Sequence, residues 1–572
     1  MAGIYGIASP NQSFGKNIYK HFYSSEKPGI LNEEYSEKAF VYGRSTLNSL
    51  ENDRFLIKKD DLIIGLEGFC YHSENDFRNW VFDEYRQAGV SFVEKLEGQF
   101  CGFIYDQSES ELHIFTDHLS TKPLYFFHDK EKKVAFFSSE LKAITKSSRA
   151  AGFSITPDSD GFRCLLTCGY MLGDLTPIKE VRKLPYGSIT TVDLNTFSIE
   201  QKKYFSIEKH PQKGNKQDFI KGINERILDA VQKEWGKDVE YSRDHITLLS
   251  GGLDSRVNAM MGAGFADNPI QSLTFSKPDT PDQKIAARIA NDLGFSHRFI
   301  SMGNGDYLAG NEYEFVKAND GLVGFYGAAH QQHALEQVDF SGKGVLHTGQ
   351  IGDVLFGSFT LKNADIKDAY RKLFFNADPH ILSKIETLQK MKTDKFDGAD
   401  VEVFSLEHRQ INGTMNGDRC CSHIADSASP FYNKELLKFC LSIPDRFKYK
   451  EAIYLDWMNE CQPELASYKW AATEAKPSND AIQKTLGFKN RLQNYLLRKA
   501  GLDKKNMNPF EDWYRANSVF SKSLDKVFEN GMPDGLDEEL RNDIIYCYNQ
   551  KSVTAKMLAV TAILSYKLHF ED

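Results

Sequence analysis

The sequence Ser250-Gly251-Gly252-Leu253-Asp254-Ser255 lies between an apolar run, residues 246–249, and a segment with helical spacing, residues 257–263. This order predicts a strand, a glycine-rich turn and a helix, which direct backbone N–H groups and a helix N-terminus at one point. Two glycines let a pyrophosphate approach the backbone, two serines offer hydroxyls, and Asp254 is a residue type that binds magnesium. The turn lacks the endings of a Walker A loop or a dinucleotide fingerprint. The plainer interpretation is an ordinary glycine turn in which Asp254 caps the helix.

Strand and helix signals alternate around this turn. Residues 219–235 and 282–293 have helical spacing, whereas residues 271–275 and 345–348 have the composition of strands. This alternation favours a parallel α/β sheet that binds a nucleotide. From about Asp365 onward the pattern is helical.

The first 205 residues carry a different pattern. Short apolar or alternating runs, separated by charged turns, occur at residues 62–66, 100–105, 112–115, 124–127 and 134–137. They predict packed antiparallel sheets with a helix or two between them. The polar segment at residues 210–216 contains a proline and a glycine and is the best linker candidate. We therefore expect two domains, residues 1–209 and residues 217–572.

Composition narrows the function classes. A chain of 572 residues is too long for one core, and its net charge of -9 argues against a general nucleic-acid binder. No apolar run approaches the length of a membrane span, and residues 1–7 resemble a first strand rather than a signal peptide. The nine cysteines contain no Cys-x-x-Cys pair, so we expect buried free thiols and a reducing cytoplasm.

Further motifs follow in order along the chain. The second half continues with Thr348-Gly349-Gln350-Ile351-Gly352-Asp353, Ser429-Pro430-Phe431-Tyr432-Asn433 and Lys476-Pro477. The first half contains Leu96-Glu97-Gly98-Gln99-Phe100, Thr116-Asp117-His118, Lys122-Pro123-Leu124-Tyr125 and Phe137-Ser138-Ser139-Glu140-Leu141-Lys142. With these motifs the chain resembles the asparagine synthetase superfamily over nearly its whole length. The resemblance implies an N-terminal Ntn-type αββα sandwich, glutaminase-like, followed by a parallel-sheet ATP-pyrophosphatase domain with a helical C-terminal part.

The resemblance also implies a site for ATP and Mg²⁺. Residues 250–255 match the pyrophosphate-binding loop, and Asp254 and Asp353 match the two magnesium ligands. Backbone groups near Leu249, Phe275 and Gly349 would hold the adenosine. The implied nucleotide-binding residues are Leu249, Ser250, Gly251, Gly252, Asp254, Ser255, Phe275 and Gly349.

Two residues are expected to take part in catalysis. Lys476 resembles the late lysine that stabilises negative charge while an acyl-adenylate forms and collapses. A surface lysine is the alternative, and Lys469 or Lys484 takes its place if the alignment shifts. Asp426 lies where many relatives carry a glutamate, which in ring-forming members joins a tyrosine as general base. Here the tyrosine position is Gln350, which cannot take a proton, and Asp426 could equally be a structural carboxylate.

The N-terminal half departs from a working glutaminase. The family's nucleophile is a cysteine at position 2, whereas this chain has Ala2 and no thiol in its first 69 residues. The glutamine-binding Asn-Gly-Glu segment is replaced by Glu67-Gly68-Phe69, and the region after it is shortened. We therefore expect a scaffold without glutamine hydrolysis, as in β-lactam synthetases and lasso-peptide macrolactam synthetases.

The expected function is an AMP-forming amide ligase that joins a small-molecule or peptide carboxylate to an amine. Ring closure or conjugation of a secondary metabolite, peptide or sugar acid is favoured over free asparagine. One alternative is glutamine-dependent asparagine synthesis, and another is a non-catalytic nucleotide-binding assembly protein. We expect no nucleic-acid or membrane partner, and a homodimer stays open.

Overall fold

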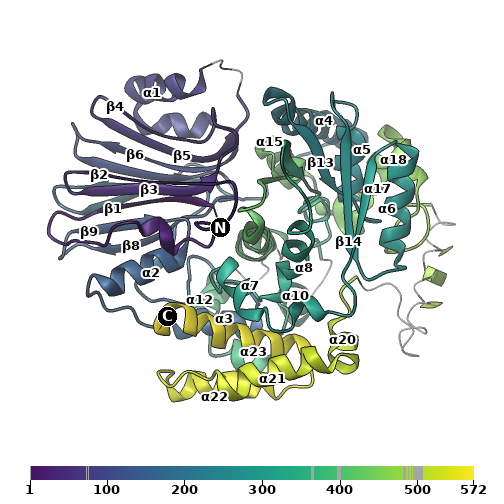
Figure 1. Cartoon of the computed structure of the whole chain (residues 1–572). Coiled ribbons are helices and arrows are strands. Elements are labelled where there is room, and N and C mark those ends of the chain that lie inside the picture. Colours follow the sequence, from purple (N-terminus) through teal and green to yellow (C-terminus); the bar gives the residue numbers. More distant parts are fainter. Residues whose placement is uncertain are drawn as a thin grey trace.

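Two stacked antiparallel sheets form in the first half of the chain, and one parallel sheet lies beside them in the second half (Figure 1). The computed structural model describes residues 2–572 except 73, 75, 362–365, 396–400, 481–484, 487, 491 and 494–506. Among the described residues, no helix combines the length and the apolar character that crossing a membrane requires.

Each antiparallel sheet has six strands. The first has the order β10 (Val181–Lys183), β8 (Tyr125–Asp129), β9 (Val134–Ser138), β1 (Gly3–Ala8), β3 (Phe40–Leu47) and β2 (Ile30–Glu37). The second has the order β12 (Ser198–Lys203), β11 (Ser188–Asp193), β7 (Glu111–Thr116), β6 (Gly98–Asp106), β5 (Leu62–Cys70) and β4 (Phe55–Lys59). Alternate residues of facing strands, such as Phe103 and Phe137, form the apolar layer between the sheets.

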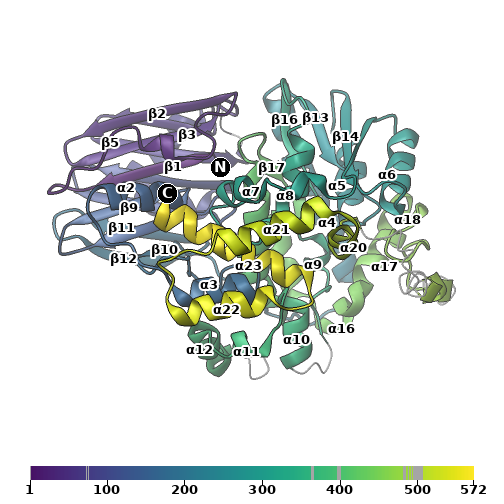
Figure 2. The same cartoon turned by 60° about the horizontal axis from the view of Figure 1, so that its bottom comes forward.

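Helices cover both outer faces of this sandwich. Helix α1 (Phe77–Ala88) packs Phe77 and Phe82 on the second sheet, whereas α2 (Leu141–Ala150) packs Ile144 on the first. Helix α3 (Ser159–Thr167) lies in the same outer layer as α2. It packs against the C-terminal helices α22 (Glu538–Tyr548) and α23 (Val553–Tyr566), as Figure 2 shows. The prediction of an αββα sandwich is confirmed.

The second half is built on a five-stranded parallel sheet. Its order is β15 (Ser296–Ser301), β14 (Ile270–Ser276), β13 (Asp244–Leu248), β16 (Lys343–His347) and β17 (Ser427–Ala428). One face is covered by α4 (Lys216–Glu240), α5 (Asp254–Gly262) and α6 (Pro281–Asp292), and the other by α7 (Glu312–Ala318) and α8 (Tyr326–Leu335). The predicted parallel α/β sheet is therefore present.

The remainder of the chain is helical, as its pattern predicts. The described helices there include α9 (Gly352–Leu355), α10 (Ile366–Leu373), α11 (Pro379–Leu382), α12 (Glu386–Lys395), α13 (Val401–Phe404), the π-helix η4 (Ser405–Thr414), α14 (Met415–Asp418), η5 (Arg419–Cys421), α15 (Lys434–Ser442), α16 (Asp445–Lys448), α17 (Ala452–Cys461), α18 (Pro463–Ser467), α20 (Phe510–Ala516) and α21 (Ser518–Asn530).

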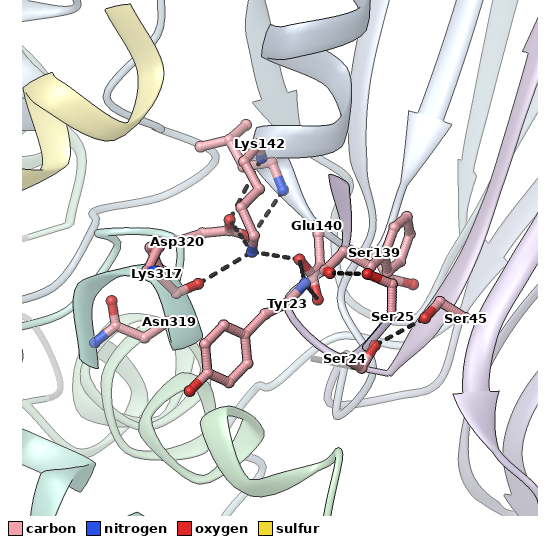
Figure 3. A network of polar contacts seen from close by, with 12 residues as sticks. Tyr23, Ser24, Ser25, Ser45, Ser139, Glu140, Lys142, Lys317, Asn319 and Asp320 are labelled. Atoms are coloured by element: carbon pink, nitrogen blue, oxygen red, sulfur yellow. Dashed lines mark hydrogen bonds and ion pairs between the residues drawn. The ribbon is translucent and has the colours of Figure 1, made fainter. Parts of the chain in front are cut away.

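Buried ionic clusters join the two halves. In one of them Lys142 lies between Glu140 and Asp320, and its Nζ is 2.9 Å from Asp320 Oδ1 (Figure 3). Lys142 also donates to the Lys317 carbonyl at 3.0 Å. The three charged side chains are at most 5% exposed, so neither carboxylate could stay buried at low cost without the lysine.

A second buried network connects α4 to the middle of the parallel sheet. His347 Nδ1 lies 2.7 Å from Glu234 Oε1, and its Nε2 lies 2.8 Å from Asp238 Oδ2. Asp238 also bonds His245 Nδ1 at 2.9 Å, and Trp235 stacks on His347. Although Asp238, His245 and His347 are close enough to hold a metal ion, these separations are hydrogen-bond lengths. Burial lowers the pKa of His347, but the two carboxylates outweigh burial and raise it to about 9.

This network predicts a pH-dependent stability. Because the folded-state pKa of His347 is raised from 6.5 to about 9, its stabilisation is complete below pH 6.5 and is lost as the pH rises through 9. The full contribution is on the order of 3 kcal/mol. We expect the thermal unfolding midpoint to fall over this pH range in the wild type and to fall much less in His347→Gln. Equal slopes in the two proteins would contradict the charged state of His347.

Candidate active site

The glycine-rich turn, residues 250–255, follows β13 and leads into α5. Ser250 Oγ lies 2.9 Å from Ser255 Oγ, and the Gly252 N–H donates to Ser250 Oγ at 3.1 Å. The Gly251 N–H donates to Asp282 Oδ1 at 3.1 Å, so α6 also fixes the turn. The predicted strand, turn and helix are present, and the N-terminus of a nine-residue helix lies at the turn.

A second turn brings Asp353 to Asp254. Asp353 begins the short helix α9 just after β16, and its backbone N–H donates to Asp254 Oδ2 at 3.1 Å. The Tyr454 hydroxyl donates to the other oxygen, Asp254 Oδ1, at 3.0 Å. Both aspartates are half-buried, so each keeps access to solvent. Residues 99 positions apart thus form one acidic pair.

Two glycines make this approach possible. A Cβ at Gly349 would lie 2.3 Å from the Ser255 nitrogen, and a Cβ at Gly352 would lie 2.5 Å from Asp254 Cγ. Both distances are far below van der Waals contact, so a larger residue at either position would push the two turns apart. Ile351 between them adopts a left-handed backbone with φ of 59°.

The acidic pair has the chemistry of a site for a hard cation. Burial, and then the charge of Asp353, raise the pKa of Asp254 well above its ordinary range, and burial also raises the pKa of Asp353. A divalent cation between the carboxylates would relieve both effects, and carboxylate oxygens are the ligands that Mg²⁺ prefers. The residues therefore fit the magnesium that the resemblance implies, and their role as its ligands stays a prediction.

Lys476 lies on the wall of a cavity of about 830 Å³. Lys372 and Lys450 share this wall, and Ser358, five positions after Asp353, contributes to it as well. Three lysines favour an anion in this space. Of the two alternatives to Lys476, Lys469 does not line the cavity, and Lys484 lies outside the described residues.

The three residues predicted to contact adenosine lie together at the carboxyl ends of β13, β14 and β16. They are Leu249, Phe275 and Gly349, and open parallel sheets bind nucleotides at this edge. The backbone of Leu249 is already engaged, because its N–H donates to Leu273 and its carbonyl accepts from Thr274 Oγ1. Contact with adenosine stays a prediction for all three.

Asp426 requires a correction. Its side chain is 2% exposed, with Oδ2 2.6 Å from Arg54 Nη2 and Oδ1 in a close ion pair with Lys122. Burial alone would raise the pKa of Asp426, but these two cations hold it well below its usual range. Both oxygens are thus bound by residues of the first half, and the carboxylate is too stabilised to accept a proton. Asp426 is a structural ion-pair residue, which was the alternative interpretation of the sequence.

Asp418, rather than Asp426, lies beside Gln350. Gln350 Nε2 donates to Asp418 Oδ1 at 3.2 Å, and Asp418 Oδ2 has no hydrogen-bond partner among the described residues. Burial raises the pKa of Asp418 to about 7, even though Gln331 and Gln350 act to lower it. A carboxylate with this pKa is suited to proton transfer near neutral pH. The sequence offered no signal for it, because Asp418 lies in a helical stretch without a motif.

Asp418 lines a pocket of about 170 Å³. Gln331 Nε2 and His330 Nδ1 are two further buried polar atoms on its wall without a hydrogen-bond partner among the described residues. Its other residues are Gly169, Val323, Gly324, Tyr326, Gly327, Ala328, Gln350, Phe375, Arg409, Gly413, Thr414 and Gly417. A cavity of this size admits a benzene-sized group. The polar side chains on its wall, Asp418, Gln331 and His330, favour a polar ligand in this space.

Charged residues on the walls of both cavities act on Asp353. Lys372 on the lysine-lined cavity and Arg409 on the Asp418 pocket both lower the pKa of Asp353, against the raising effect of burial. Gln350, three positions before Asp353, reaches into the Asp418 pocket.

Ala2, which the resemblance matches to the glutaminase nucleophile, is buried against the second half. The Ala2 N–H donates to Ser422 Oγ of the second half at 3.0 Å, and Ala2 is 4% exposed. Glu67 is bound to Arg54 Nε at 3.0 Å, and Phe69 is completely buried. Cys70 is buried as well, and burial raises the pKa of its thiol, so it has little nucleophilic character.

Comparison with known families agrees with this architecture. Residues 67–205 match the family model described as a glutamine amidotransferase domain, and residues 222–475 match the model described as asparagine synthase. The chain belongs to the asparagine synthetase superfamily. The two matches lie on the sandwich and on the parallel-sheet half, respectively.

Curated relatives of this superfamily member are distant. Asparagine synthetase [glutamine-hydrolyzing] 2 of Bacillus subtilis is 22% identical over 353 residues, which cover 55% of this chain and 46% of the relative. Asparagine synthetase B [glutamine-hydrolyzing] of Escherichia coli is 24% identical, over 38% of this chain and 35% of the relative. The amidase chyE of Penicillium rubens is 24% identical, over 49% and 43%. The chain thus spans less than half the length of these three relatives.

The acidic pair predicts two effects of opposite sign in Asp353→Asn. Because the pKa of each carboxyl is raised by folding, both aspartates destabilise the free protein at neutral pH, and the neutral variant should unfold at a higher temperature. Mg²⁺ with ATP at 100 times its Kd should stabilise the wild type by about 2.7 kcal/mol and the variant much less. Thermal unfolding with and without Mg²⁺ and ATP measures both effects. Asp229→Asn, at a side chain 54% exposed, is the control and should change neither value.

Proposed function

We propose that this protein is an ATP-dependent amide ligase that forms AMP and pyrophosphate and takes its nitrogen from a substrate amine. The observation that carries the proposal is the acidic pair beside the glycine-rich turn, in which the Asp353 N–H donates to Asp254 Oδ2 at 3.1 Å. The match of residues 222–475 to asparagine synthase supports an amide-forming ligase in general. The nine cysteines are all free, which is consistent with a reducing cytoplasm.

Each part of the site would have one task. A substrate carboxylate would attack the α-phosphorus of ATP, and pyrophosphate would leave into the turn at residues 250–255 and the lysine-lined cavity. Asp254 and Asp353 would hold Mg²⁺, which when bound neutralises the charge of the leaving group. Lys476 would stabilise the negative charge that gathers on phosphate and acyl oxygens. An amine would then attack the acyl carbon, and AMP would leave.

Asp418 is the group that would accept a proton from the amine. Asp418 lines a pocket large enough for a small amine, and Gln350 Nε2 donates to its Oδ1 at 3.2 Å. Gln350 cannot itself take a proton, so Asp418 would act without the tyrosine that the ring-forming relatives use.

Glutamine-dependent asparagine synthesis is the rival function. Two relatives carry that activity in their names, but the Ala2 N–H donates to Ser422 Oγ, and Phe69, in the segment that the resemblance matches to glutamine binding, is completely buried. These contacts favour a first half without glutamine hydrolysis. A nucleotide-binding protein without catalysis is the less economical alternative, because it gives no reason for the unpaired Asp418 oxygen.

The ligase proposal predicts AMP and pyrophosphate release from Mg²⁺-ATP that depends on a carboxylate. A panel of carboxylates would be offered with ¹⁵N-labelled ammonium, amide-¹⁵N glutamine or primary amines, and the product masses would be measured. We expect the label to come from ammonium or an amine and never from glutamine. Transfer of the glutamine label into the product would establish the rival function instead.

Asp418→Asn separates the two half-reactions. General-base catalysis contributes about 10²–10⁴-fold, so amide formation should slow by that factor while carboxylate-dependent exchange of labelled pyrophosphate into ATP continues. In the wild type, amide formation should rise with pH through about 7, where Asp418 loses its proton, and the variant should lack this limb. Equal loss of both half-reactions would contradict the role of Asp418.

A further inference from the structure

One continuous segment, residues 405–421, forms a wall of the Asp418 pocket. It comprises the π-helix η4, helix α14 and η5, and we call it the pocket segment. Its residues on the pocket side are Arg409, Gly413, Thr414, Gly417 and Asp418. A π-helix of this length is rare, and such helices occur mostly at functional sites.

The opposite side of the pocket segment rests on the first half of the chain. The Tyr186 hydroxyl donates to Glu407 Oε1 at 2.6 Å, and the Gly173 N–H lies 3.2 Å from His408 Nδ1. At the other end Arg419 donates to the Ser139 carbonyl at 2.9 Å. The first of these bonds is made by Glu407 and the last by Arg419. The pocket residues of the segment lie between these two positions in the sequence.

Asn412 is the central anchor of this contact. Its Oδ1 accepts from Lys183 Nζ at 2.6 Å, and its Nδ2 donates to the carbonyls of Met171 at 3.0 Å and Gly173 at 2.9 Å. All the partners belong to the first half, and Asn412 is 1% exposed. Since Gly413, its neighbour, lines the pocket, any shift of Asn412 moves the pocket wall directly.

The contribution of Lys183 to stability does not by itself explain why a lysine is buried at this position. It is 6% exposed and ends strand β10, where an apolar residue would bury at lower cost. Burial, and then the charge of Arg419, lower the pKa of Lys183 to about 7, so its desolvation is not offset by an ion pair. Its ammonium group donates to Asn412 Oδ1 at 2.6 Å.

We propose that the first half of this protein serves as a brace for the amine pocket, and that Lys183 is a positioning residue that acts through Asn412. The inference rests on the proposed function, because it takes the Asp418 pocket as the site of the amine. It assigns a task to a glutamine amidotransferase-like domain whose nucleophile position is Ala2. Lys183 touches neither substrate nor ATP in this scheme, so its removal should alter amine binding and leave adenylation intact.

The test compares two half-reactions in Lys183→Met, which keeps the length and removes the donor. We expect the KM for the amine to rise at least tenfold, while pyrophosphate exchange and the KM for ATP stay within twofold of the wild type. If Lys183 acts through Asn412, the double variant with Asn412→Leu should raise the amine KM no further than Asn412→Leu alone. An unchanged amine KM in Lys183→Met, or additive effects in the double variant, would overturn the proposal.

A matched pair of milder variants covers the case in which Lys183→Met does not fold. Tyr186→Phe removes the hydroxyl that bonds Glu407 on the pocket segment. Tyr241→Phe removes a similar hydroxyl, bonded to Asp53 Oδ2 at 2.7 Å, from another contact between the two halves. Only Tyr186→Phe should raise the amine KM. Equal effects of the two variants would mean that contacts between the halves act only on general stability, and this result would overturn the proposal.

The outcome for the brace can be distinguished from the outcome for the ligase itself. If the wild type shows no carboxylate-dependent pyrophosphate exchange, the proposed function fails before any variant is compared. If exchange and amide formation are present and the variants leave the amine KM unchanged, the ligase stands and the brace fails.

Discussion

The close approach of two turns is the constraint on which the active site depends. The turn after β16 can lie against the start of α5 only because Gly349 and Gly352 have no side chains at the points of contact. This approach creates the acidic pair and places Gln350 at the mouth of the Asp418 pocket. The electrostatic cost of two neighbouring carboxylates is thus built into the backbone, and a divalent cation is the natural way to offset it.

A buried chain of charges joins the two halves. Glu67, in the segment that the resemblance matches to glutamine binding, pairs with Arg54, and Arg54 pairs with Asp426 just before β17. Breaking this chain would leave buried ions unpaired, so the first half contributes to the stability of the second half.

The sequence predicted the elements whose signals are local. The glycine-rich turn and three strands of the parallel sheet lie where the motifs and periodicity indicated, whereas the pairing of Asp254 with Asp353 was implied by the resemblance. Strand β15 was missed because it is largely exposed and carries charged residues, and β17 because it has two residues. The sequence pointed to Asp426 rather than Asp418 as the base for a different reason. Their roles depend on partners such as Arg54 and Gln350, which are distant in the sequence and become neighbours only through folding.

Assigning the base to Asp418 instead of Asp426 changes the chemistry that the pocket can perform. A phenol beside a carboxylate could pass a proton onward, whereas Gln350 only donates a hydrogen bond and holds Asp418 in place. In the proposed scheme, proton acceptance rests on a single carboxyl whose pKa is raised to about 7 by burial. Such a base depends on exclusion of water, because any opening of the pocket would return its pKa toward the ordinary value. The reactivity of the site therefore depends on the rigidity of the pocket wall. The first half of the chain contacts that wall along its length.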